Sequence, residues 1–285
     1  MKTTDVIAAI DGSPASDAVL RWAEAEAAAT GARLRVVLAY HWRRPRTVAA
    51  TQDLAGLAHG RAEVIVEAAT EDVHRRRPGI AVSGHAVFGD AADVLTGMAA
   101  DAAMVVVGSR GHTALSAALG AGVGTRVATH AHGCVVVVRG RAGADAGPVV
   151  VGVDGSHTDN RLLHTAFEEA ARRGCGVVAI RCFADPAPPW GIGIPVLALS
   201  PAPTRATLHA ELADDVERWR EKYPGVPAEA RMPCGDPASV LLDASREAQL
   251  LVVGGRGTVS ALLLGSVSHR MLLHSDCPVL IARGD

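Results

Sequence analysis

Two aspartates that end similar apolar runs are the first residues in this chain that could do chemistry. Asp11 lies in VIAAIDGS and Asp154 lies in VVVGVDGS. A carboxylate at the end of a buried strand can accept hydrogen bonds from the hydroxyl or amino groups of a small ligand. The alternative is an Asx turn or a helix cap. Ala9 and Gly152, two residues before each aspartate, are small enough for a ligand to approach the backbone or for a helix to pack closely.

A glycine-rich stretch near the C-terminal end is suited to a second kind of chemistry, the binding of an anion. The apolar run from Leu250 ends in glycines, and a helical pattern begins after a further glycine. Backbone N–H groups at a helix N-terminus have no intrahelical acceptor, and the helix dipole favours a negative charge there. The candidate residues of this loop are Gly254, Gly255, Arg256, Gly257, Gly265, Ser266, Val267 and Ser268.

The same stretch occurs earlier in the chain in a changed form. Its candidate residues are Gly108, Ser109, Arg110, Gly111, Gly122, Val123 and Gly124. Ala121 stands where the later copy has Gly265, and glycines replace its two serines. The later copy keeps the serine hydroxyls, but its loop is two residues shorter. The sequence therefore leaves open which copy binds an anion better.

These motifs belong to a repeat that covers the chain. Asp154 follows Asp11 by 143 residues and Gly254 follows Gly108 by 146, so equivalent positions keep nearly the same offset. A repeat with such small offsets indicates duplication of one domain. The expected organisation is a first domain over 1–140, a linker over 141–147 and a second domain over 148–285.

Each copy alternates apolar runs with helical patterns. Strands that are apolar on both faces predict a parallel sheet covered by helices on both sides, which is a doubly wound α/β fold. Such sheets bind ligands beyond the carboxyl ends of their strands, where the strand order reverses. The longer predicted helices are Ala15–Thr30, Leu57–Val73, Thr158–Arg173 and Ala206–Lys222.

The motifs together resemble those of the universal stress protein family, in its tandem-domain actinobacterial form. The resemblance rests on the two Asp-Gly-Ser motifs, on Gly235-Asp236-Pro237 and on the glycine loops, and it covers nearly the whole chain. It implies two flavodoxin-like sheets with strand order 3-2-1-4-5 and ATP at the switch point. It also implies that the last strands of the copies, 135–138 and 279–281, pair with each other, which would cover two exposed apolar edges. The aspartate would meet the adenosine and the glycine loop the phosphates, through which Mg²⁺ could also be held.

The sequence indicates a binding protein rather than an enzyme. It contains no Gly-x4-Gly-Lys-(Ser/Thr) loop, no GxSxG and no HExxH, and phosphoryl transfer needs more than a glycine loop. A nucleotide-sensing regulator of stress adaptation or growth is the leading interpretation. A nucleotide-free interaction scaffold and a slow ATPase are the alternatives.

Composition narrows the partners. A net charge of −2 among 285 residues argues against a nucleic-acid or anionic-membrane surface. Five dispersed cysteines show no metal-ligand spacing and fit a reducing cytoplasm. We therefore expect no metal site, ATP as the ligand, and a protein partner that the sequence does not identify. A homodimer of whole chains is left open.

Overall fold

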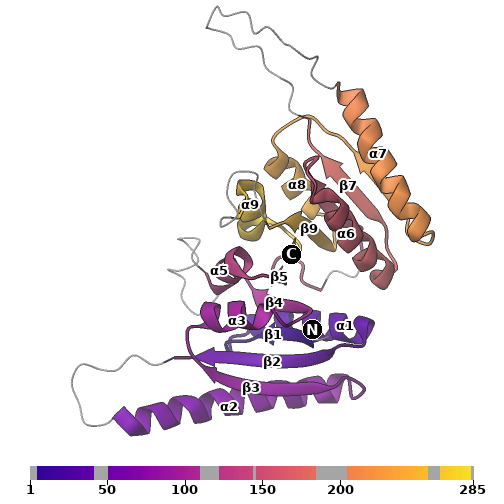
Figure 1. Ribbon diagram of the computed structural model, residues 1–285. Helices are drawn as coiled ribbons and strands as arrows, with labels where there is room; N and C mark the ends of the chain where they lie inside the picture. The colour runs from indigo at the N-terminus through magenta and orange to yellow at the C-terminus, as the bar shows by residue number, and fades with distance from the viewer. Residues whose placement is uncertain are drawn as a thin grey trace, which may run out of the picture.

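A computed structural model describes residues 5–41, 51–109, 122–143, 146–183, 204–255 and 264–283 (Figure 1). The first half contains β1 Asp5–Ala9, α1 Ala15–Thr30, β2 Arg33–Tyr40, α2 Thr51–Arg76, β3 Val82–Phe88, α3 Ala91–Ala99, β4 Met104–Gly108, α5 Val123–His130 and β5 Cys134–Val138. The second half contains β6 Val149–Val153, α6 Asp159–Arg173, β7 Val177–Arg181, α7 Arg205–Lys222, β8 Ala228–Arg231, α8 Pro237–Ser245, β9 Leu250–Gly254, α9 Ser266–His274 and β10 Val279–Ala282.

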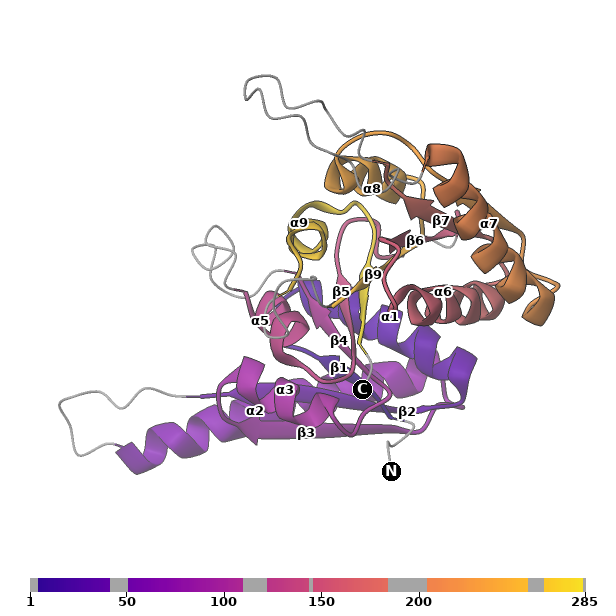
Figure 2. The same cartoon turned by 45° about the horizontal axis from the view of Figure 1, so that its top comes forward.

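The predicted strand order is confirmed in both halves. The strands form one ten-stranded sheet in the order β3-β2-β1-β4-β5-β10-β9-β6-β7-β8, so each half has the order 3-2-1-4-5. All pairs within a half are parallel. The strands at the centre of each half are almost completely buried because helices cover both faces of the sheet (Figure 2). One core layer packs under α1, α2, α6 and α7, and the other under α3, α5, α8 and α9. No helix within the described residues is long and apolar enough to cross a membrane.

Helix boundaries agree with the sequence patterns except at α2. Helix α1 occupies the predicted range, and α6 and α7 begin within one residue of their predicted starts. Helix α2 begins at Thr51, six residues before the predicted Leu57. The segment between these residues contains no proline and continues in helical register, so nothing in it stops the helix.

The two halves join through their last strands, as the sequence predicts. Strand β10 pairs antiparallel with β5, with Val279 opposite Val137 and Ile281 opposite Val135. This pairing covers both edges and makes one sheet from two repeats. Because the pair is antiparallel, the carboxyl ends of the strands in the first half point opposite to those in the second half. The two switch points therefore lie at opposite ends of the strands that form the sheet.

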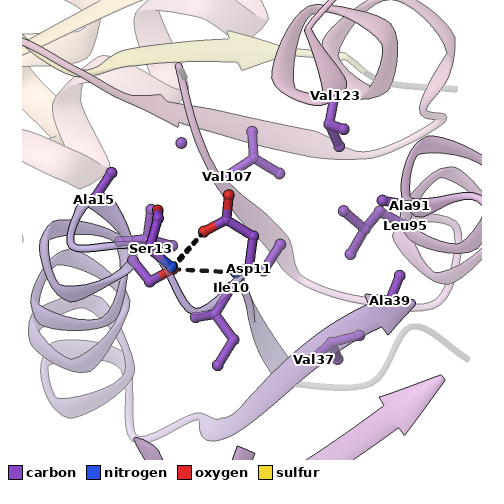
Figure 3. Close-up of a pocket in the computed structure, with 14 residues that line it drawn as sticks. Ile10, Asp11, Ser13, Ala15, Val37, Ala39, Ala91, Leu95, Val107 and Val123 are labelled. Atoms are coloured by element: carbon purple, nitrogen blue, oxygen red, sulfur yellow. Dashed lines mark hydrogen bonds between the residues drawn. The ribbon is translucent and has the colours of Figure 1, made fainter. Parts of the chain in front are cut away.

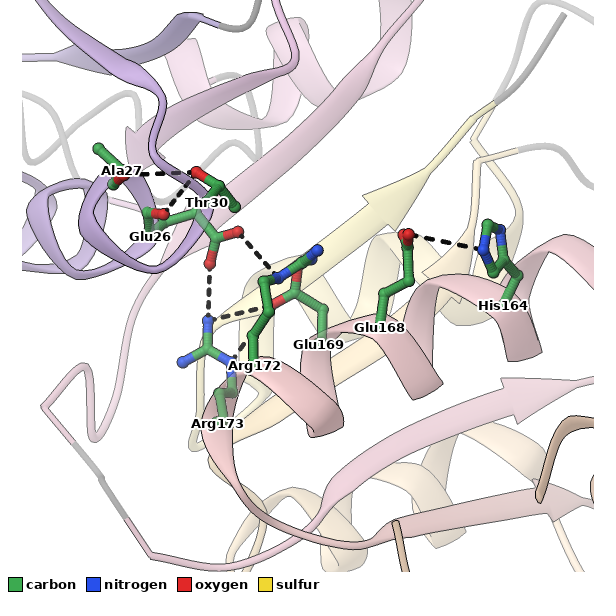
Figure 4. Close-up of polar contacts among 8 residues, drawn as sticks. All are labelled: Glu26, Ala27, Thr30, His164, Glu168, Glu169, Arg172 and Arg173. Atoms are coloured by element: carbon green, nitrogen blue, oxygen red, sulfur yellow. Dashed lines mark hydrogen bonds and ion pairs between the residues drawn. The ribbon is translucent and has the colours of Figure 1, made fainter. Parts of the chain in front are cut away.

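A cluster of buried charges forms a second contact between the halves (Figure 4). Glu26 from α1 is 4% exposed and pairs with Arg172 and Arg173 from α6, at 3.5 and 3.2 Å. Both arginines also pair with the fully buried Glu169, and the Arg173 guanidinium lies over the ring of Trp22. Burial, and then the nearby Glu169 carboxylate, raise the pKa of Glu26 to about 7 against the pull of the arginines. Helices α1 and α6 are thus joined through Glu26, whose charge changes near neutral pH.

Candidate functional site

The switch point of the second half brings together residues that are about a hundred positions apart in sequence. Strand β6 lies beside β9, with Val151 opposite Val252, so Asp154 and Gly254 emerge from neighbouring strands. They share a cavity of about 310 Å³ with the start of α9. Other lining residues come from the strands, from the start of α6 and from α8: Gly152, Val153, Thr158, Leu162, Ile180, Cys182, Pro237, Leu241 and Val253.

The N-terminus of α9, where the sequence predicts an anion site, opens into this cavity. Helical hydrogen bonding begins with the N–H of His269 donating to the carbonyl of Gly265 at 2.9 Å. The N–H groups of Ser266 and Val267 precede that bond and have no acceptor within the helix, and both residues line the cavity. The hydroxyl of Ser268 instead donates to the carbonyl of Gly254 at 2.7 Å. Ser268 therefore braces the helix against β9.

Asp154 sits in a turn that a second carboxylate holds in place. One oxygen of Asp154 accepts from the N–H of Ser156 at 3.0 Å, which is an Asx turn. The buried carboxylate of Asp159 accepts from the N–H groups of Asp154 and Gly155, at 3.3 and 2.7 Å. Burial raises the pKa of Asp159 to about 6, although the two backbone hydrogen bonds oppose the shift.

An arginine closes this turn from the neighbouring strand. The guanidinium of Arg181 occupies the space where a side chain on residue 155 would lie, and the φ of +86° at Gly155 favours glycine there. Arg181 also approaches Glu211 of α7 at 3.5 Å. The turn that carries Asp154 is therefore surrounded by a half-buried group of charges.

The switch point of the first half has the same plan but a smaller cavity (Figure 3). Strands β1 and β4 are neighbours, and the carboxylate of Asp11 lies across from Val107 and Val123. Apolar side chains line much of the pocket, whose volume is about 90 Å³. The predicted residues that line it are Ala9, Asp11, Gly108 and Val123.

A hydroxyl, that of Ser16, lies beside Asp11 at the position where a carboxylate, that of Asp159, lies beside Asp154. The Oδ1 of Asp11 accepts from the N–H of Ser13 at 3.0 Å and from the hydroxyl of Ser16 at 2.9 Å. Ser16 occupies the position equivalent to Asp159. The carboxylate of Asp11 takes the N–H group of Ser13, and no side chain caps α1. Both aspartates thus have the local turn role, in addition to facing a cavity.

The glycines of α5 explain why the first cavity is narrow. A Cβ on Gly124 would lie 2.7 Å from the carbonyl oxygen of Gly108, so α5 approaches β4 more closely than a serine at this position would allow. At the equivalent position, the side chain of Ser268 lies between α9 and β9, and its hydroxyl contacts the carbonyl of Gly254. Gly122 precedes α5 without any side-chain cap.

The remaining predicted residues are placed as follows. Ser109 and Gly255 directly follow β4 and β9, and their N–H groups donate to Val138 and Ala282 of the neighbouring strands. Arg110, Gly111, Ala121, Arg256 and Gly257 lie outside the described residues. Within the described residues, no group of three or more His, Cys, Asp and Glu side chains could hold a metal ion.

The sequence patterns missed Ser16, Asp159 and Arg181. Their only signal was the offset of the repeat, which aligns Ser16 with Asp159 and, through the strand register, Leu38 with Arg181. Comparing the chemical types at aligned positions would have shown that only the second turn has further charged side chains beside its aspartate.

Comparison with known proteins identifies the family. The model of the universal stress protein family matches residues 3–139 and again 146–283. The chain belongs to the universal stress protein family. Universal stress protein MT2052 of Mycobacterium tuberculosis (strain CDC 1551 / Oshkosh) is 32% identical over 303 residues, covering 98% of this chain and 94% of that protein. Universal stress protein Mb2028c of Mycobacterium bovis is 33% identical over 296 residues, covering 99% and 98%.

The tandem arrangement also occurs in a solved universal stress protein. The crystal structure of the protein from Archaeoglobus fulgidus DSM 4304 superimposes with a TM-score of 0.75 at 18% identity, covering 100% of this chain and 98% of that one. At this identity the likeness shows the shared fold.

Proposed function

We propose that this universal stress protein binds an adenine nucleotide, ATP, and that the second switch point is its main site. The observation that carries the proposal is the shared cavity of Asp154, Gly254 and the N-terminus of α9. A hydrogen-bond acceptor for a nucleoside and an anion site for phosphates thus open into one space. This arrangement suits a ligand with a polar, uncharged part and an anionic part.

Cavity size favours the second site. Pockets that bind small molecules usually have volumes of about 300–1,000 Å³. The second cavity, at about 310 Å³, reaches that range, whereas the first, at about 90 Å³, does not. We infer that the first site binds nucleotide weakly or only after α5 moves away from β4.

In the proposed complex, Asp154 accepts from a ribose hydroxyl or from the adenine amine. The N–H groups of Ser266 and Val267, with the hydroxyl of Ser266, donate to phosphate oxygens, and the helix dipole adds to the attraction. Arg256 and Gly257 are proposed phosphate contacts from the sequence motif alone. Mg²⁺ would be held through the phosphates, since the described residues offer no metal cluster of their own.

The proposed role is that of a regulator which reports nucleotide level in the cytoplasm, rather than that of an enzyme. The described part of the cavity holds one carboxylate, Asp154, beside its anion site and no base positioned by a second group. Phosphoryl transfer requires a positioned nucleophile and charge stabilisation in addition to binding. The protein partner and a homodimer of whole chains stay predictions.

The test is to purify the chain under native conditions, identify any released nucleotide by mass, and titrate the emptied protein with ATP–Mg²⁺ and with GTP–Mg²⁺. We expect an adenine nucleotide to co-purify and ATP to raise the melting temperature more than GTP does. A chain that carries no nucleotide and shows no thermal shift with ATP would support the scaffold alternative. ADP formation that a D154A substitution abolishes would support the slow ATPase.

A further inference from the structure

Two arginines at equivalent positions follow the last strand of each half. Arg139 follows β5, and its Nη1 donates to the carbonyl of Met271 near the end of α9, at 3.1 Å. Arg283 follows β10 and donates to the carbonyls of Ala128 and Ala131 at the end of α5, at 2.7 and 3.2 Å. Each arginine therefore binds the C-terminal end of a helix in the other half, where the helix dipole favours a cation.

Arg283 also holds Gly255, the described start of the glycine loop in its own half. Its Nη2 donates to the carbonyl of Gly255 at 3.2 Å, and the N–H of Gly255 donates to Ala282 at 3.3 Å. A Cβ on residue 255 would lie 2.4 Å from Nε of Arg283, so the glycine lets the arginine side chain cross the loop. Gly255 is thus fixed through both of its backbone polar groups.

Gly255 directly follows Gly254, which lines the second cavity, and Ser268 of α9 is bonded to Gly254. One guanidinium consequently joins the start of the second glycine loop to the end of α5. The opposite end of α5 carries Val123 at the first cavity. These contacts of Arg283 connect two halves whose switch points lie at opposite ends of the strands.

We propose that Arg283 is a positioning residue of the second nucleotide site. From the boundary between the halves its guanidinium fixes the position of Gly255 beside that site, and it connects Gly255 to the C-terminal end of α5. The inference rests on the proposed function for its effect on affinity, but the positioning itself is independent of any ligand. If the guanidinium sets the loop, the second site is complete only while the first half is docked. By linkage, a nucleotide that reduces the motion of Gly254 and Gly255 also reduces the motion of the C-terminal end of α5.

The test compares the intact chain with R283M, R283K and R141M. Arg141 is a matched control because its guanidinium also donates to a backbone carbonyl, that of Ala248, away from the glycine loop. Hydrogen exchange is measured without nucleotide on peptides that contain Gly254 and Gly255 and on peptides that contain 128–131. We expect R283M to accelerate exchange in both segments, R283K to restore part of the protection, and R141M to change neither. Equal exchange in R283M and R141M would overturn the inference.

A second arm uses ATP–Mg²⁺ on a D11A background, in which only the second site is unchanged. We expect ATP to slow exchange in 128–131 when Arg283 is present and not in R283M. We also expect R283M to weaken ATP affinity about tenfold, the size typical for loss of a hydrogen bond from a charged group. ATP protection of 128–131 that survives in R283M would contradict the link. If the intact chain binds no ATP while R283M still loosens both segments, the proposed function fails and the positioning role stands.

Discussion

The two switch points share one backbone plan and differ in what fills the space around the aspartate. At the first, Ser16 holds Asp11 and Ile65 packs above Gly12; at the second, Asp159 and Arg181 surround the turn of Asp154. Their helices differ as well, since Gly124 lets α5 close against β4 whereas Ser268 keeps α9 away from β9. Duplication preserved the strand order, and a few side chains at the end of the strands produced one narrow and one wider cavity. A family motif therefore indicates where a ligand would bind, whereas the neighbouring side chains decide whether there is room for it.

The largest expected effect concerns the ion pairs of Glu26 with Arg172 and Arg173, which join the two halves and their sites. Because the pKa of Glu26 is raised from 4.5 to about 7, the folded chain binds an extra proton between these values. The stabilisation is full below about pH 4.5 and is lost as the pH rises through about 7. A shift of this size corresponds to about 3 kcal/mol of unfolding free energy. Chemical denaturation at pH 5 and pH 8 should show this loss in the intact chain and much less of it in E26Q.

The control is E24Q, because Glu24 is a buried glutamate on the same helix that pairs with Arg76 inside the first half. It should keep the pH dependence of the intact chain. If E26Q and the intact chain lose the same stability between pH 5 and pH 8, Glu26 is not the group that titrates at the boundary.

The next effect in size tests why the first cavity is narrow. In G124S the new Cβ meets the backbone oxygen of Gly108, and overpacking of this kind costs about 1–3 kcal/mol. In S268A the Cβ stays and only the hydrogen bond to Gly254 is lost, for about 1 kcal/mol. Thermal melting of both variants checks the order. A G124S protein as stable as the intact chain would mean that α5 can withdraw to the spacing of α9.

How far the sequence could predict this molecule depends on the range of the interactions. The ends of α1 were predictable because periodicity and a glycine stop specify them locally. The strand order and the pairing of β5 with β10 were predictable from the resemblance to the family. The brace from Ser268 to Gly254 was not, because the serine was assigned to the ligand from its motif. The role of Arg283 was not predictable either, since its side chain reaches Gly255 across the fold of its own half and Ala128 only after the halves dock. Side-chain contacts of this kind leave no mark in the pattern of one repeat.

The smallest expected effect is on ATP affinity, when a serine hydroxyl is added at residue 122 of the first site or removed from Ser266 of the second. A Cβ on Gly122 would lie 3.9 Å from the carbonyl of Ser109, an ordinary contact, so G122S fits and gives α5 the cap that it lacks. We expect G122S to raise ATP affinity at the first site, and S266A to lower it at the second, by about two- to tenfold each. Titration calorimetry on D154A and D11A backgrounds separates the two sites. An S266A protein with unchanged affinity would show that the backbone of α9 alone binds the phosphates.

The most direct test of the difference between the sites is ATP binding by D11A and D154A, measured by calorimetry and by native mass spectrometry. Each substitution removes the carboxylate of one site and the matching turn, so each is a control for the other. If the second switch point is the main site, D11A keeps one ATP per chain near the affinity of the intact protein, and D154A loses at least tenfold. Retention of ATP by D154A together with its loss in D11A would contradict this account.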